Sequence, residues 1–160
     1  MNTVRLAIVS CLFLGCSPFA PGTVGTLGGV LLAVVLQALF PDRLILVWSA
    51  VAVALFVWGC LQSKFVARTW PREDPGQFVL DEVVGYLVTV ITYAALAQQA
   101  PGPLAHTAAF FAFRFFDVAK IQPAKKLEDL HGAFGIMADD QVAGLYAGLS
   151  IWLVLPLLGW

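Results

Sequence analysis

The chain alternates between apolar runs and short polar connections. A helix that crosses the hydrocarbon layer of a bilayer needs about 20 mainly apolar residues, because that layer is about 30 Å thick. Five runs approach or reach this length, although the fourth is apolar only in its first part: residues 26–40, 44–62, 83–98, 104–120 and 142–158. Helices satisfy their own backbone hydrogen bonds in lipid. The pattern therefore predicts an all-α, polytopic membrane bundle of about five helices.

A shorter apolar run, residues 6–14, precedes these five. It is too short to span the bilayer, so we expect an interfacial or re-entrant segment at the N-terminus. Two alternatives are a plain signal peptide and a lipoprotein signal ending at Gly15-Cys16. The segment SPFAPGTVGTLGG, residues 17–29, leads directly into the next apolar run. That continuity favours retention of residues 1–16.

Composition supports a membrane protein. The 160 residues are 60% hydrophobic and 12% charged, and the mean hydropathy is +0.86. Soluble domains are about 45–50% apolar and about 25% charged. The length fits one domain, residues 1–160. The sequence has no basic patch with interleaved aromatic residues of the kind that binds nucleic acid. The three cysteines, Cys11, Cys16 and Cys60, have neither metal-site spacing nor an even count, so we interpret them as reduced packing residues.

Cationic residues are unevenly placed along the chain. If the helices alternate in direction, the connections at 17–25, 63–82 and 121–140 share one membrane face. That face carries Lys64, Arg68, Arg72, Lys120, Lys125 and Lys126, whereas the other face carries Arg43. Cytoplasmic loops of membrane proteins are enriched in Lys and Arg. We therefore expect the charged face to lie in the cytoplasm.

Three charges interrupt the phenylalanine-rich segment FFAFRFFDVAK, residues 110–120. Arg114, Asp117 and Lys120 follow one another at intervals of three, which places them on one side of a continuous helix. A charge within a membrane helix is costly unless it meets a partner or water. An ion pair that only joins helices is one explanation. A functional site at the depth of the lipid headgroups is the other, and it explains all three charges.

Acidic pairs precede two of the apolar runs. Asp81 and Glu82 stand before residues 83–98, and Asp139 and Asp140 stand before residues 142–158. Acids at helix N-termini can simply complement the helix dipole. Together with Asp117, however, all five carboxylates fall on the same predicted face. Mg²⁺ prefers oxygen ligands and bridges to substrate phosphates, so this set predicts a magnesium site.

Two glycine-containing segments could contribute to phosphate binding. Gly22, Gly25 and the hydroxyls of Thr23 and Thr26 are expected to precede a helix, where backbone N–H groups can bind an anion. A tight turn is the simpler interpretation. His131, in HGAFGIM, could donate to phosphate or protonate a leaving group, but a lone histidine can equally be a loop residue.

Four motifs in this order resemble the phosphatidylglycerophosphatase A family of bacterial membrane lipid phosphatases: SPFAPGTVGTLGG, DEVVGY, FRFFDVAKIQPAKKLED and HGAFGIMADDQVAGLYAG. The resemblance extends from Ser17 to about Gly148. It departs from the family pattern where Ile121-Gln122-Pro123 replaces a Lys-Pro step and where Ala133 replaces a glycine. Neither change removes an acidic or basic site position.

The resemblance implies Mg²⁺-dependent hydrolysis of the terminal phosphate of phosphatidylglycerophosphate, a phospholipid, in the bacterial inner membrane. Matched by motif, the site residues are Thr23, Asp81, Glu82, Arg114, Asp117, Lys120, His131, Asp139 and Asp140, and Gly22 adds its backbone. We expect Asp81, Glu82, Asp117, Asp139 and Asp140 to share the metal, and Arg114 and Lys120 to neutralise the phosphate. Asp139 or Asp140 would activate water, or a carboxylate would attack phosphorus directly.

Two other classes of membrane protein remain as alternatives. A small transporter or ion-coupled carrier also holds intramembrane Arg and Asp. Such a site would lie near the middle of the bilayer, often between repeats, and no repeat is present. A structural subunit would use the acidic pairs only as helix starts, and it leaves the spacing of Arg114, Asp117 and Lys120 unexplained.

Overall fold

The computed structural model describes residues 3–70, 75–128 and 133–159, and these residues form helices and no strand. The predicted all-α membrane fold is thus confirmed. The elements, in chain order, are α1 (Thr3–Val9), η1 (Leu14–Cys16), α2 (Pro21–Leu39), η2 (Pro41–Arg43), α3 (Leu44–Cys60), α4 (Ser63–Thr69), α5 (Leu80–Ala97), α6 (Pro103–Ala119), α7 (Ala124–Glu128) and α8 (Ala133–Leu157). Arg72 and His131 lie outside the described residues.

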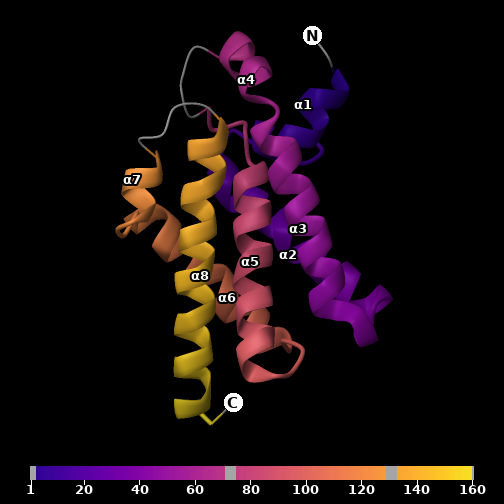
Figure 1. Cartoon of the computed structure of the whole chain (residues 1–160), viewed down its shortest axis with the longest axis vertical. Coiled ribbons are helices and arrows are strands. Elements are labelled where there is room, and N and C mark those ends of the chain that lie inside the picture. The colour runs from indigo at the N-terminus through magenta and orange to yellow at the C-terminus, as the bar shows by residue number, and fades with distance from the viewer. Residues whose placement is uncertain (1–2, 71–74, 129–132, 160) are drawn as a thin grey trace.

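The five long helices α2, α3, α5, α6 and α8 correspond to the five predicted apolar runs (Figure 1). Four stretches of the described chain are long and apolar enough to cross a membrane: Pro21–Leu39, Pro41–Cys60, Leu80–Ala97 and Phe134–Leu157. The N-terminal segment forms the short α1 and η1, joined through left-handed backbone at Cys11, Leu12 and Phe13. As expected from its length, it is no span.

Two helix starts differ from the sequence expectation. The helix expected from residue 26 begins at Pro21, where proline at the first position fixes φ and sacrifices no hydrogen bond. Gly22, Thr23, Gly25 and Thr26 therefore lie in the first two turns of α2, not in a loop before it. The helix expected from residue 142 begins at Ala133, so the interpretation of Asp139 and Asp140 as N-terminal acids of that helix is wrong.

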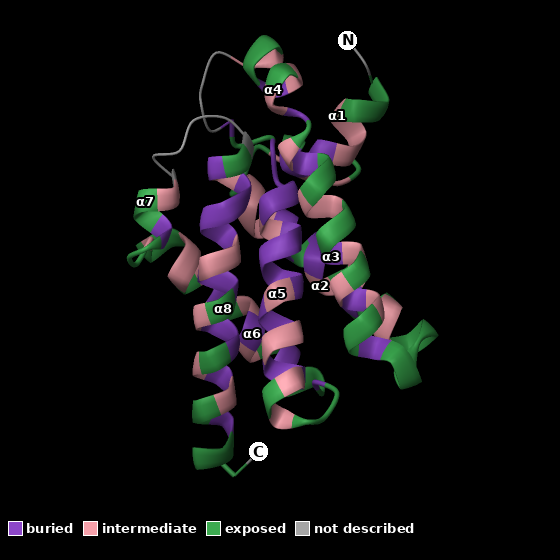
Figure 2. Ribbon diagram, viewed as in Figure 1, coloured by how far each residue is buried: buried purple, intermediate pink, exposed green. Residues whose placement is uncertain are grey.

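Helix α5 is the central element, and its residues are the most consistently buried (Figure 2). It packs closely on α8 through glycines. A Cβ on Gly144 would collide with the carbonyl oxygen of Gly85, and one on Gly148 would lie 2.5 Å from the Thr92 Cβ. Small residues permit such close backbone approach between membrane helices, where packing rather than water exclusion drives association.

The outer faces of the long helices are apolar. Leu31 on α2, Leu46 on α3 and Leu153 on α8 are each more than half exposed. Large exposed apolar surfaces are unusual in soluble monomers but are expected where lipid covers the protein. Cys11 is partly buried beside these helices, and burial raises the pKa of its thiol above the ordinary value. It therefore behaves as a packing residue.

Candidate active site

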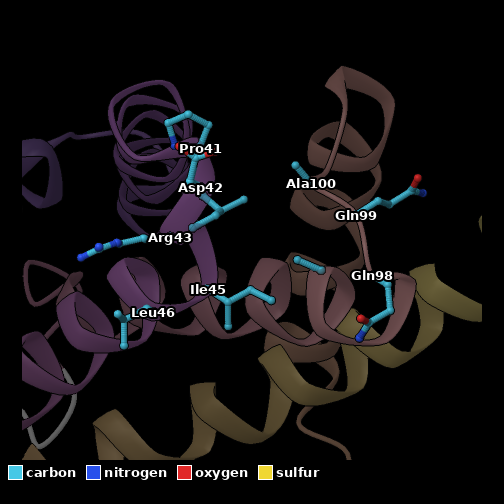
Figure 3. A pocket seen from close by; sticks show the side chains of 10 residues that line it. Pro41, Asp42, Arg43, Ile45, Leu46, Gln98, Gln99 and Ala100 are labelled. Carbon is cyan, nitrogen blue, oxygen red and sulfur yellow. The ribbon is translucent and has the colours of Figure 1, made fainter.

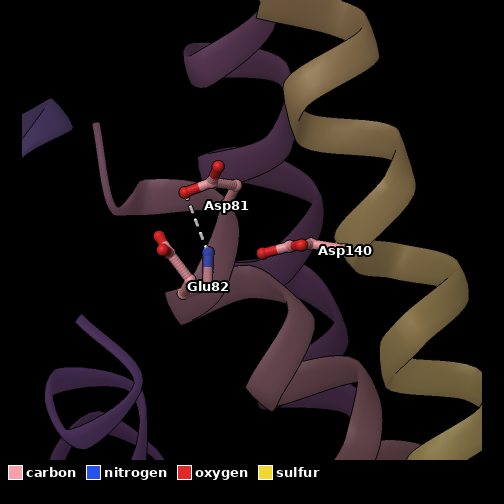
Figure 4. Close-up of side chains that lie close together, drawn as sticks. All are labelled: Asp81, Glu82 and Asp140. Carbon is pink, nitrogen blue, oxygen red and sulfur yellow. Dashed lines mark hydrogen bonds between the residues drawn. The ribbon is translucent and has the colours of Figure 1, made fainter. Parts of the chain in front are cut away.

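Three carboxylates from α5 and α8 meet at one end of the bundle. Asp81 and Glu82 occupy the first turn of α5, and Asp140 reaches them from α8 (Figure 4). One oxygen from each residue lies within 4.8 Å of the other two. The close packing at Gly85 explains the approach, because the carbonyl oxygen of Asp140 would lie 2.9 Å from a Cβ on that glycine.

Two carboxylate oxygens in this cluster are buried without a partner. Asp140 is 4% exposed, and its Oδ2 has no hydrogen-bond partner among the described residues. The same holds for Glu82 Oε2. Asp81 is oriented by its own helix start, since Asp81 Oδ1 accepts the Glu82 backbone N–H at 3.0 Å. Buried ionised carboxylates are strongly destabilising unless they are paired or coordinate a metal. The donor set therefore fits a hard cation such as Mg²⁺.

Arg114 connects this cluster to α6 and α2. Its Nη1 lies 2.6 Å from Asp117 Oδ2 and 4.0 Å from Glu82 Oε1. Arg114 also donates to the Thr26 hydroxyl at 3.5 Å. Thr26 is fully buried on α2, and its hydroxyl donates to the Gly22 carbonyl. One guanidinium thus contacts groups from three helices, and its five N–H donors allow it to bind a ligand as well.

The first turn of α2 lies directly on the Glu82–Arg114 pair. A Cβ on Gly22 would lie 2.5 Å from Glu82 Oε1 and 3.1 Å from Arg114 Nη1. A side chain here would therefore have to displace the ends of the Glu82 and Arg114 side chains. Backbone N–H groups in the first turn of a helix have no intrahelical acceptor, so α2 also presents donors at the site.

Lys120 is placed differently from the sequence expectation. Helix α6 ends at Ala119, and Lys120 is its C-cap, with φ 43° and ψ 54° in the left-handed region. The three charges therefore do not continue one helical stripe. The Lys120 Nζ lies 2.8 Å from Asp139 Oδ2 on α8, and Asp139 Oδ1 accepts the Asp140 backbone N–H. Lys120 thus joins the site through Asp139.

Most of the predicted site residues are brought together by four segments far apart in the chain: the starts of α2 and α5, the C-terminal half of α6 with its C-cap, and α8. They are Gly22, Asp81, Glu82, Arg114, Asp117, Lys120, Asp139 and Asp140. Thr23 stands beside Gly22 but makes none of the hydrogen bonds that link this group within the described chain. His131 lies outside the described residues. Thr26, which contacts Arg114, was considered only as a possible phosphate-binding hydroxyl and was not among the site residues matched by motif, although it occupies the last position of the P-G-T-x-G-[ST] pattern.

Two cavities have none of the three carboxylates in their lining. One, of about 610 Å³, is lined by residues of η1, Pro21 and the segment before α5, and it adjoins the start of α2. The other, of about 510 Å³, lies between η2 and the C-terminal end of α5 and is lined in part by Arg43, Ile45 and Gln98 (Figure 3). It sits at the opposite end of α5 from Asp81, so it is separate from the charged site.

Comparison with known proteins agrees with this arrangement. The family model "Phosphatidylglycerophosphatase A" matches residues 7–155. Phosphatidylglycerophosphatase A of Haemophilus influenzae is 33% identical over 84% of this chain and 78% of its own length. The Escherichia coli protein of the same name is 28% identical over 88% and 77%. A Bacteroides thetaiotaomicron protein with the provisional name phosphatidylinositol-3-phosphatase is 34% identical over 86% and 84%.

No solved structure matches this chain. The family match, however, spans nearly the whole sequence, and it includes every carboxylate and both cations of the site. The resemblance inferred from the four motifs is confirmed. The chain therefore belongs to the phosphatidylglycerophosphatase A family, and it is an enzyme that hydrolyses phosphoric monoesters.

Proposed function

We propose that this enzyme removes the terminal phosphate of phosphatidylglycerophosphate with Mg²⁺ as cofactor, at the cytoplasmic face of the bacterial inner membrane. The products are phosphatidylglycerol and inorganic phosphate. The observation that supports this most is the meeting of two buried carboxylates, Asp81 and Asp140, and the partly buried Glu82 with Arg114 at one end of an apolar bundle. A phosphate can reach this end while acyl chains remain in lipid.

The substrate is supported by the family and by two of the three relatives, which are named for phosphatidylglycerophosphate hydrolysis. The Bacteroides relative is named for a phosphoinositide instead. All three names describe a phosphomonoester on the headgroup of a phospholipid. The site thus has a clear chemical class of substrate, and the two headgroups must be compared in one assay.

Asp81, Glu82 and Asp140 would hold the metal, because their oxygens converge and two of these oxygens, Glu82 Oε2 and Asp140 Oδ2, lack a partner within the described part of the chain. Asp117 and Asp139 are each engaged by a cation, so they are less available as ligands than the other three. A bound Mg²⁺ would supply charge neutralisation at the phosphate and a more acidic water. This assignment reduces the metal ligands from the five carboxylates expected from the sequence to three.

The cationic side chains act on the phosphate. Arg114 offers a planar set of donors that matches phosphate oxygens, and Asp117 fixes its orientation from one turn along α6. Lys120, oriented by Asp139, neutralises charge that develops on the leaving glycerol oxygen. Water forms the new bond to phosphorus as the ester P–O bond breaks, and the proton lost by water balances the one gained by the glycerol.

A carboxylate at the site must accept the proton of the attacking water. Asp139 and Asp140 are adjacent on α8, and Asp140 points into the cluster. Attack by a carboxylate on phosphorus, followed by hydrolysis of the acyl phosphate, is the other route. Trapping with hydroxylamine distinguishes the two, because only the covalent route yields an aspartyl hydroxamate.

The orientation rests on the distribution of cations. Lys64 and Arg68 lie on α4, and Lys125 and Lys126 lie on α7, whereas Arg43 lies at the far end of α3. The positive-inside tendency places the former group in the cytoplasm. The charged site at one end of the bundle also differs from the midplane position of a carrier site.

The decisive test measures phosphate release by the purified protein in detergent. Phosphatidylglycerophosphate and phosphatidylinositol 3-phosphate are offered in parallel, each with Mg²⁺ or with EDTA. We expect release from phosphatidylglycerophosphate that EDTA abolishes and that Asp140→Asn and Glu82→Gln reduce by about a hundredfold or more. Release that survives chelation would refute the metal assignment, and release only from the phosphoinositide would refute the substrate.

A further inference from the structure

An apolar groove of about 240 Å³ lies outside the carboxylate cluster and has no role in the chemistry described above. It runs between α3 and α8, with α5 as its floor. Its lining residues are mostly small and aliphatic: Ala52, Val53 and Phe56 from α3, Val84 and Val88 from α5, and Gln141 from α8.

The groove exists because α3 and α8 meet only near the charged end of the molecule. A Cβ on Gly59 would lie 2.6 Å from the Met137 Sδ, so the two helices are in close contact there. The rings of Phe56 and Phe134 also pack edge to face, with centroids 6.1 Å apart. Further along, α3 leans away from α8, which leaves α5 uncovered between them (Figure 1).

The groove lies close to the carboxylate cluster along α5 and α8. Val84 follows Asp81 by one helical turn and Val88 follows it by two, which places them about 4.5 and 10 Å along the axis of α5. Gln141 directly follows Asp140 on α8. The groove therefore begins about one turn from the carboxylates and runs toward the apolar middle of the bundle.

We propose that this groove binds one acyl chain of the phospholipid substrate and so sets the position of the phosphate. The inference rests on the proposed function. A phosphate at Asp81, Glu82 and Asp140 leaves the chains of the same lipid to run toward the bilayer centre, which is the direction of the groove. Its lining suits a single chain, since α3, α5 and α8 all contribute apolar atoms and the one amide is at Gln141.

A second copy of this chain is the main competing occupant. A stable protein interface buries about 800 Å² on each partner, whereas this groove holds only about 240 Å³ and is lined by six residues. Gln141 is also engaged within its own helix, where its amide donates to the Met137 carbonyl at 2.9 Å. These features favour a lipid chain.

The groove contributes to the reaction by holding the acyl chain, and with it the phosphate, in one position. A chain that moves from lipid into an apolar groove gains little from solvent exclusion, because lipid tails are as apolar as the groove. Holding the chain does fix the distance between phosphate and catalytic groups, and small misplacements can cost about a hundredfold in rate. Filling the groove should therefore slow hydrolysis of long-chain substrate while the catalytic groups stay intact.

The test fills the groove with Val53→Trp. Val53 is 63% exposed toward lipid, so the substitution is compatible with folding. Val154→Trp is the matched control, since Val154 is 48% exposed on α8 and does not line the groove. Both variants are assayed with phosphatidylglycerophosphate that carries oleoyl chains and with the same headgroup on butanoyl chains. Oligomeric state is measured for each.

We expect Val53→Trp to lower kcat/KM for the oleoyl substrate by about tenfold or more and to leave the butanoyl substrate within about twofold. Val154→Trp should match the wild type on both. Equal effects on the two substrates, no effect on either, or a changed oligomeric state in Val53→Trp alone would overturn the assignment of the groove. An inactive wild type on both substrates would instead refute the proposed function.

A non-hydrolysable phosphonate analogue gives an independent readout. With a photoreactive group on its acyl chain, it should label peptides that contain Val53 or Val88, and excess unlabelled phosphatidylglycerophosphate should prevent the labelling. Labelling confined to α2 or to the far end of α8 would overturn the proposal even if the enzyme is active.

Discussion

At the scale of single residues, the site depends on one position where an added side chain must displace the charged groups beside it. Gly22→Ala would place a methyl group 2.5 Å from Glu82 Oε1 and displace the Glu82–Arg114 pair. We expect kcat to fall by about ten- to a hundredfold, because both groups must be held in place for phosphate binding. Gly102→Ala is the control, since nothing lies within 4 Å of its added Cβ. Equal activity of the two variants would contradict this account.

The carboxylate cluster predicts that Asp140→Asn lowers activity without lowering stability in the absence of Mg²⁺. Asp140→Asn removes one charge from a cluster in which Asp140 Oδ2 lacks a partner, so without Mg²⁺ its Tm should equal or exceed that of the wild type. Added Mg²⁺ should raise the wild-type Tm by stabilising the folded state, and this rise should vanish in Asp140→Asn. Thermal unfolding in detergent with EDTA or Mg²⁺ measures both effects.

Asp42→Asn is the control for that experiment, because Asp42 lies in η2 at the far end of the molecule. Added Mg²⁺ should raise the Tm of this variant as much as it raises the wild-type Tm. A magnesium-dependent rise of Tm that persists undiminished in Asp140→Asn would remove Asp140 from the set of metal ligands, whatever the activity of the variant.

At the scale of helices, a buried polar network joins α2, α5 and α6 away from the site. The His106 ring bonds to the Tyr86 hydroxyl at 2.9 Å and to the Gln37 side chain at 3.1 Å, and Gln37 also donates to the Pro101 carbonyl. His106→Phe keeps the ring volume but leaves the Gln37 oxygen unpaired. We expect a loss of about 1–3 kcal/mol in stability, seen as a lower Tm.

The activity of His106→Phe should remain close to wild type well below its Tm, because His106 contacts none of the carboxylates or cations of the site in the described structure. Thr107→Ala, at an exposed neighbour, should change neither property. A large loss of kcat without a change in Tm would show that the network acts on the chemistry and not on helix packing.

The helices were largely predictable from the sequence, and the contacts between them were not. Apolar length located the five long helices, because only helices satisfy the backbone in lipid. The start of α8 was missed because Asp139 and Asp140 resemble N-terminal acids, whereas their burial against α5 and Lys120 keeps them inside the helix. Likewise, nothing local in the sequence shows that α6 ends before Lys120 or that Thr26 meets Arg114.

At the scale of the whole molecule, the alternation of helices gathers charges from distant segments at one end of an apolar body. α5 and α8 both begin at the end where α4 lies, and the C-terminus lies at the opposite end (Figure 1). The acids and bases of the site gather at the end where α5 and α8 begin, and the rest of α5 is buried mainly by apolar residues. In the proposed function, the phosphate of the lipid substrate lies at this end and its chains extend along the apolar body.

This arrangement makes a prediction about membrane orientation that does not depend on activity. In a variant whose three cysteines are replaced by serine, single cysteines are introduced as Lys126→Cys on α7 and Arg43→Cys in η2. A membrane-impermeant thiol reagent should label Arg43→Cys in intact spheroplasts and Lys126→Cys only in inverted vesicles, because Lys-rich segments remain in the cytoplasm. Labelling of both positions from one side would show that α3, α5 and α6 together do not cross the bilayer an odd number of times. Labelling in the reverse sense would place the carboxylates outside the cytoplasm.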